Sequence, residues 1–207
     1  MTASPQAPIR VDLQLIADII PSGARVLDVG CGDGVLLAHL ARTKGVDGRG
    51  IELSQAGVNV CVANGLSVIQ GDADTDLCGY PSDVFDFVIL SQTLQATRDP
   101  KGVLADLVRI GRRAVVSFPN FGHWRVRWQL VSQGRMPVTR QLAHAWYDTP
   151  NIHLCTIRDF LVLCAGMGVA IERGLALDDR GRVLSYPATG ARANLCAAQG
   201  MFVLRRG

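Results

Sequence analysis

Apolar residues along this chain follow two patterns, helical stripes and short continuous runs. The stripes recur every three or four residues, and several of them end at a glycine or a proline. They predict helices over 12–20, 34–45, 55–65 and 100–111. The short runs between them predict strands over 24–30, 48–53, 66–70, 85–90 and 113–119. Because strand and helix alternate, we expect a parallel sheet with helices on both faces.

The pattern changes after Pro119. Residues 119–155 contain all three tryptophans of the chain and four arginines against one acid, Asp148. Regular periodicity then returns, and it predicts a helix over 156–168 and two last strands over 169–177 and 200–206, joined by a glycine- and arginine-rich loop. The chain is therefore predicted to hold a loose tail over 1–9 and one domain over 10–207, with an aromatic and basic insertion over 119–155.

Composition narrows the class of protein. The chain has 207 residues, 48% of them hydrophobic, and a formal net charge of +3, which is too small to indicate a nucleic-acid binder by itself. It has no run of about 18 apolar residues and no basic start followed by an apolar stretch, so we expect no membrane helix and a cytoplasmic protein. The six cysteines form no CxxC pair and no zinc-finger spacing, so no metal is expected.

Three glycines, Gly30, Gly32 and Gly34, follow the first predicted strand and open the next helix. A backbone without side chains turns tightly and comes close to a ligand, and the start of a helix offers free N–H groups. In an open parallel sheet, ligands bind at the carboxyl ends of the strands, where this loop is predicted to lie. The other interpretation is a glycine-rich turn without a ligand, and only the neighbouring motifs can distinguish the two.

Two acids stand at the ends of the next two strands. Glu52 can accept hydrogen bonds from both hydroxyls of a ribose, and Asp72 can accept one from an adenine amino group. Each acid alone also fits a helix cap or a solvated surface, but their order along consecutive strands favours a ligand that contains adenosine. Asp28, just before the loop, would repel a pyrophosphate and attract a cation. The spacing also departs from the dinucleotide fingerprint, so a nicotinamide oxidoreductase is the weaker alternative.

These motifs resemble a known family. VLDVGCGDG (26–34) resembles motif I of class I S-adenosylmethionine-dependent methyltransferases, and IELS (51–54), GDAD (71–74) and FDFVILSQTLQAT (85–97) resemble the motifs that follow it. The resemblance covers residues 10–120 and 156–206. It implies an α/β, Rossmann-like class I methyltransferase fold, with a mostly parallel seven-stranded sheet, an antiparallel edge hairpin and helices on both faces.

The resemblance also implies a cofactor, S-adenosylmethionine or S-adenosylhomocysteine. Its methionine part would lie against the glycine loop, with its amino group held by Asp28 directly or through water. Glu52 would hold the ribose, and Ser91 and Gln92 would line the reaction side. The implied cofactor-binding residues are Asp28, Gly30, Gly32, Glu52, Leu53, Asp72, Ala73, Ser91 and Gln92.

The residues that would carry catalysis are not determined. Methyl transfer needs a positioned nucleophile and often a base. Many small-molecule methyltransferases have a histidine near the end of the fourth-strand segment, where this chain has Gln95, which cannot accept a proton. His123, Tyr147 or His153 of the insertion are candidates for the missing base, although a lone histidine is more often a structural residue.

Trp124 and Trp128 are spaced to share one face of a helix. Such a stripe is more often part of a core than a binding surface. With Arg125 and Arg127 alongside, it also has the composition of a protein–protein hot spot. Stacking on nucleic-acid bases is a third and weaker interpretation, because the patch is small and has no lysine.

The insertion carries a closer resemblance. FPNFGHWRVRWQL (118–130), GRMP (134–137) and WYDTPNIHLCTIRDF (146–160) resemble segments of MetW-type methionine biosynthesis proteins. This resemblance implies an accessory or regulatory partner of homoserine O-acyltransferase (MetX), with no nucleic acid or membrane as partner. The alternative is an active S-adenosylmethionine-dependent methyltransferase of a small molecule, because a fold alone does not establish function.

Overall fold

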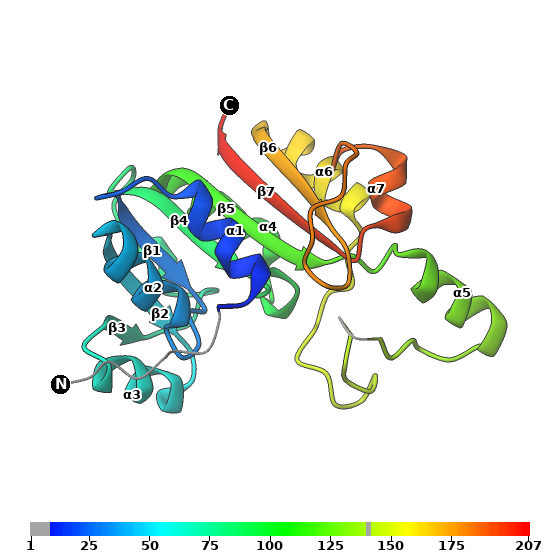
Figure 1. Ribbon diagram of the computed structural model, residues 1–207, viewed down its shortest axis with the longest axis horizontal. Helices are drawn as coiled ribbons and strands as arrows, with labels where there is room; N and C mark the ends of the chain where they lie inside the picture. Colours follow the sequence, from blue (N-terminus) through cyan, green and yellow to red (C-terminus); the bar gives the residue numbers. More distant parts are fainter. Residues whose placement is uncertain (1–8, 140–141) are drawn as a thin grey trace.

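The computed structural model describes residues 9–139 and 142–207, which form one seven-stranded sheet with helices around it (Figure 1). The strands are β1 (Arg25–Val29), β2 (Asp47–Glu52), β3 (Ser67–Gln70), β4 (Phe85–Ser91), β5 (Gly111–Pro119), β6 (Val169–Leu177) and β7 (Gln199–Arg206). The α-helices are α1 (Val11–Ile19), α2 (Val35–Lys44), α3 (Gln55–Ala63), α4 (Pro100–Ile110), α5 (Trp124–Gln133), α6 (Ile157–Gly166) and α7 (Ala191–Cys196). Two short 3₁₀ helices, η1 (Leu77–Gly79) and η2 (Leu94–Ala96), follow β3 and β4.

The strand order is β3-β2-β1-β4-β5-β7-β6. The first five strands are parallel, whereas β7 runs antiparallel to both β5 and β6. The predicted fold is therefore confirmed, including the antiparallel hairpin at the edge. All five parallel strands end on the same side, which brings the loops after them together.

Side chains of the central strands alternate between two cores. On β4, Val88 and Leu90 pack with residues of α4 and α6, whereas Phe87 and Ile89 pack with residues of α1 and α2. Figure 1 shows these helix pairs on opposite faces of the sheet. Because both faces are covered, the strands are apolar at most positions, which is the pattern that predicted them.

Two regions differ from the expected elements. Helix α7 lies in the segment predicted as a loop. It is short, and it is anchored from outside, since the Asn120 side chain donates to the carbonyls of Asn194 and Ala197 and the Ala193 side chain is buried. The predicted tail over 1–9 lies outside the described residues except for Ile9, which packs on the core beside α1.

The insertion leaves the sheet at the end of β5 and carries α5 away from the body of the molecule (Figure 1). His123 caps the start of α5 by accepting from the Arg125 N–H, and Gly134 ends it in a left-handed conformation. Within the described part of the chain, no helix is long and apolar enough to cross a membrane.

Candidate functional site

The glycine loop connects β1 to α2. Gly30, Gly32 and Gly34 have φ values of +71°, +59° and +74°, which favour glycine at all three positions. A Cβ on Gly30 would lie 2.7 Å from Thr93 Oγ1, so this glycine allows the loop after β4 to approach. A Cβ on Gly32 would meet no atom within 4 Å. The side of the loop at Gly32 therefore faces open space at the end of the sheet.

Glu52 supports this loop from the end of β2. Its carboxylate accepts from the Gly32 N–H at 2.8 Å through Oε2 and from the Ser54 N–H at 2.9 Å through Oε1. A carboxylate has about four acceptor positions, so each oxygen keeps capacity for one more donor. This geometry suits the two hydroxyls of a ribose. The neighbouring Leu53 side chain is exposed, which leaves an apolar surface beside the carboxylate.

Asp28 lies on β1 directly below the loop and is 3% exposed. Its side chain has no hydrogen-bond partner among the residues that the structure describes. Burial, together with the nearby Glu52 charge, raises the pKa of Asp28 to about 7. A buried carboxylate without a hydrogen-bond partner is stabilised by a cation, so the site suits a ligand with an ammonium or sulfonium group.

The acids after β3 have different roles. The Asp74 carboxylate accepts from the backbone N–H groups of Arg98 and Asp99, so it ties this loop to the start of α4. Asp72 accepts only from the Asp74 N–H, through Oδ1, among the described residues. Asp72 is therefore the acid with a free oxygen. Ala73, between them, packs against the core.

The end of β4 supplies Ser91 and Gln92. Ser91 Oγ lies 3.2 Å from Ser117 Oγ, and the Gln92 N–H donates to the Ser117 carbonyl at 2.9 Å. Gln92 has a φ of +56°, which is uncommon for a residue with a side chain and is frequent at functional sites. Gln95 is buried, and its amide donates to the Gln92 carbonyl at 2.6 Å. The structure thus brings all the predicted cofactor residues to one edge of the sheet.

A cleft of about 640 Å³ opens beside Gln92. It lies between the start of α1, the loop after β4, the loop after β6 and the end of the insertion. Its lining residues are Arg10, Val11, Asp12, Gln92, Gln95, Pro119, Ala143, His144, Pro150, Asn151, Asp179, Arg180, Gly181 and Gln199. The size is in the range of small-molecule sites.

The three predicted candidates for a base do not line this cleft. His123 caps α5 and lies in a different cavity, the Tyr147 side chain is 77% exposed, and His153 Nε2 pairs with the Arg98 carbonyl. Burial and the Arg125 charge lower the pKa of His123. The histidine that lines the cleft is His144, which sequence reasoning did not single out. It lies in an irregular segment without periodicity, so no local pattern indicated its position.

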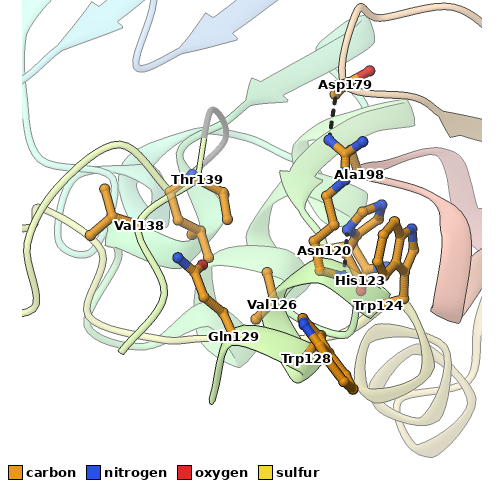
Figure 2. Close-up of a pocket in the computed structure, with 12 residues that line it drawn as sticks. Asn120, His123, Trp124, Val126, Trp128, Gln129, Val138, Thr139, Asp179 and Ala198 are labelled. Carbon is orange, nitrogen blue, oxygen red and sulfur yellow. Dashed lines mark hydrogen bonds and ion pairs between the residues drawn. The ribbon is translucent and has the colours of Figure 1, made fainter. Parts of the chain in front are cut away.

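The aromatic surface of α5 lies apart from the glycine loop. Trp124 is 47% exposed and Trp128 is 68% exposed, whereas Val126 is the buried residue of the helix. The interpretation of the tryptophan pair as core is therefore wrong. Both residues line a cavity of about 500 Å³, and Figure 2 shows their side chains. Arg125 packs over the Trp124 ring and pairs with Asp179 at 3.4 Å.

Comparison with known proteins gives the family. Residues 10–204 match the family described as methionine biosynthesis protein MetW. The chain belongs to the MetW family. A bifunctional methionine biosynthesis protein MetXA/MetW from Rhodopirellula baltica is 36% identical over 184 residues, which is 84% of this chain and 30% of that protein. The family assignment argues against the nicotinamide oxidoreductase alternative.

Other known proteins are similar to this MetW-family chain in sequence or in structure. A ubiquinone biosynthesis O-methyltransferase from Xylella fastidiosa is 37% identical over 56% of this chain and 52% of its own. This chain thus spans about half or less of the length of these relatives. An S-adenosylmethionine-dependent methyltransferase structure from Mesorhizobium loti aligns with a TM-score of 0.68 at 18% identity, over 96% of this chain and 99% of its own.

A second solved structure with this fold carries a different activity in its name. The [4+2]-cyclase SpnF aligns with a TM-score of 0.66 at 18% identity, over 94% of this chain and 80% of its own. These neighbours establish the class I methyltransferase fold for the MetW-family chain. They leave its chemistry open, because one fold supports several activities.

Proposed function

We propose that this MetW-family protein binds S-adenosylmethionine or S-adenosylhomocysteine at the glycine loop and acts as an accessory or regulatory partner of homoserine O-acyltransferase. The observation that carries the partner role is the exposed aromatic and basic surface of α5. Trp124, Arg125 and Trp128 together present the residue types that anchor protein–protein interfaces. The relative that combines MetXA and MetW in one chain supports the choice of partner.

The proposed cofactor fits the residues at the edge of the sheet. Asp28 offers a buried negative charge for the methionine ammonium, and the open side of Gly32 leaves space for the ligand against the loop. Glu52 has capacity for the ribose hydroxyls, and Asp72 has a free oxygen for the adenine amino group. The cofactor, when bound, would supply the adenosyl group and, as S-adenosylmethionine, a transferable methyl.

A chain of contacts runs from the glycine loop to the end of the insertion, the segment that also carries α5. The Ile152 and His153 N–H groups of the insertion both donate to the Gln95 carbonyl, at 2.8 and 2.9 Å. Gln95 in turn donates to the Gln92 carbonyl, and Thr93 between them lies against Gly30. A shift of the glycine loop on ligand binding would therefore reach the insertion through direct contacts. Coupling of this kind is typically worth about 1–3 kcal/mol.

The alternative function, methyl transfer to a small molecule, is favoured by the cleft beside Gln92. The cleft adjoins the predicted reaction side and has the volume of a ligand site. His144 on its wall is a histidine, the residue type that most often acts as a general base.

The cofactor proposal is tested at Glu52 by calorimetry with S-adenosylhomocysteine. Glu52→Ala removes charge-assisted hydrogen bonds worth about 1.5–3 kcal/mol each, so affinity should fall at least about tenfold. Asp33→Ala is the matched control, because Asp33 is an exposed acid of the same loop whose carboxylate bonds only to the Val35 N–H among the described residues. Equal affinity of wild type and Glu52→Ala for S-adenosylhomocysteine would show that Glu52 does not bind the cofactor.

The partner proposal is tested by co-purification with homoserine O-acyltransferase, with and without S-adenosylmethionine. We expect a stable complex whose yield changes with the cofactor. A chain that elutes separately under both conditions, yet transfers a methyl group to a small molecule, would favour the alternative.

A further inference from the structure

The cleft beside Gln92 contains two hydrogen-bond acceptors without donors. The side-chain oxygens Oε1 of Gln95 and Gln199 are buried and have no hydrogen-bond partner in the described structure. Both residues line the cleft, and Gln95 is 7% exposed. An unsatisfied buried acceptor costs free energy that a donor from a ligand would recover. The last torsion of a glutamine side chain is broad, and binding would require each amide to rotate so that its oxygen faces the cleft. For Gln95 this rotation would exchange the hydrogen bond to the Gln92 carbonyl for one to the ligand.

The charged groups of the cleft are paired, with one exception. Asp12 is bound by Arg10, and Asp179 pairs with Arg125. Arg180 is exposed on the cleft wall, and its guanidinium has no partner among the described residues. The unpaired groups are thus two carbonyl oxygens, which accept hydrogen bonds, and one guanidinium, which binds carboxylates.

We propose that this cleft is a second ligand site that binds a small α-amino acid. The ammonium would donate to Gln95 Oε1 and Gln199 Oε1, and the carboxylate would pair with Arg180. The remaining part of the ligand would face Gln92, and its position opposite the cofactor rests on the proposed function above. The amide oxygens and Arg180 are contributed by separate elements, the loop after β4, the start of β7 and the loop after β6. Ligand selection therefore depends on the tertiary arrangement of the cleft.

The test uses L-homoserine as the probe, titrated into protein saturated with S-adenosylhomocysteine and followed by saturation-transfer NMR and calorimetry. Two analogues separate the contacts, since 4-hydroxybutyrate lacks the ammonium and 3-aminopropan-1-ol lacks the carboxylate. We expect each analogue to bind at least about tenfold more weakly than L-homoserine. The same titration without S-adenosylhomocysteine tests the cleft even if the cofactor proposal fails.

Variants of Gln199 and Arg180 test which side chain contacts which group of the ligand. Gln199→Leu should weaken L-homoserine at least about tenfold and leave both the affinity for S-adenosylhomocysteine and the melting temperature unchanged, because the lost oxygen had no partner. Arg180→Gln should weaken L-homoserine but not 3-aminopropan-1-ol. Gln133→Leu, an exposed glutamine at the end of α5, is the control and should change nothing.

Three results would overturn the proposal. If S-adenosylhomocysteine displaces L-homoserine, the cleft holds only the methionine end of the cofactor. Equal binding of 4-hydroxybutyrate, or affinity for L-homoserine unaffected by Gln199→Leu and Arg180→Gln, would show that these groups do not hold the ligand. The absence of L-homoserine binding to wild-type protein, with or without S-adenosylhomocysteine, would also refute it.

Discussion

Asp28 is a carboxylate that folding places in an unfavourable environment. It is buried and unpartnered among the described residues, and its pKa rises from an ordinary value of 3.8 to about 7. Because the folded pKa lies above the unfolded one, this group lowers stability as pH rises from about 4 to about 7. A bound cation would offset this loss of stability.

Asp28→Asn should therefore separate stability from binding. Above pH 7 the variant should resist urea better than wild type, and it should bind S-adenosylhomocysteine more weakly. Wild-type affinity should fall about tenfold between pH 8 and pH 6 as Asp28 gains a proton, whereas the variant should show a nearly flat profile. Calorimetry at several pH values measures this, and parallel pH profiles for the two proteins would contradict the role of Asp28.

Substitutions of Gly32 and Gly34 are predicted to have different effects, although both residues have positive φ. A Cβ on Gly32 meets open space, but one on Gly34 would lie 2.5 Å from Leu66 Cδ1 and 2.8 Å from Cys61 Sγ. Gly32→Ala should cost only about 1–2 kcal/mol of stability while it strongly weakens cofactor binding. Gly34→Ala should lower the melting temperature much more. Thermal unfolding and calorimetry of both variants would show whether the open side of Gly32 is ligand space.

Helix α5 is the element in which the partner interface is predicted. Trp128 is 68% exposed and has no role in the cores of the sheet, so Trp128→Ala should leave the melting temperature nearly unchanged. Truncation of an interface anchor costs about 2 kcal/mol or more, so affinity for homoserine O-acyltransferase should fall at least about thirtyfold. Val162→Ala, an exposed apolar residue of α6, is the control. Unchanged affinity of Trp128→Ala for the acyltransferase would show that α5 is not part of the interface.

Arg125 is a less direct probe of that interface. It pairs with Asp179 and packs on Trp124, so charge reversal would also disturb the loop after β6. Arg125→Glu is therefore expected to lower partner affinity together with some loss of local order, unlike Trp128→Ala.

For the whole molecule, cofactor binding and partner binding are predicted to be linked. If S-adenosylhomocysteine changes the affinity for homoserine O-acyltransferase by a given factor, the acyltransferase must change the affinity for S-adenosylhomocysteine by the same factor. We expect a factor of about 5 to 150, measured by calorimetry of each ligand with and without the other. If neither ligand changes the affinity for the other, the protein is a partner of the acyltransferase that the cofactor does not regulate.

Local patterns predicted most of the fold. Buried strands and amphipathic helices have distinct apolar spacings, and the loops after parallel strands must meet at one edge, so Gly30, Glu52 and Asp72 lie at the same end of the sheet, as the pattern predicted. Thr156 and Asp159 form a capping box at the start of α6, which is a local feature because its two residues are only three apart. Helix α7 was missed because it depends on Asn120, a residue about seventy positions away in the chain.

The amino-acid sequence by itself determined the alternation of elements, the position of the glycine loop after β1 and the composition of the insertion. Only the tertiary structure decided that Trp124 and Trp128 face outward, since the spacing of two tryptophans is the same on a buried and an exposed helix face. It also decided that His144, Gln199 and Arg180 share a cleft. These residues come from three segments far apart in the chain, and only the packing of those segments around the end of the sheet brings them together.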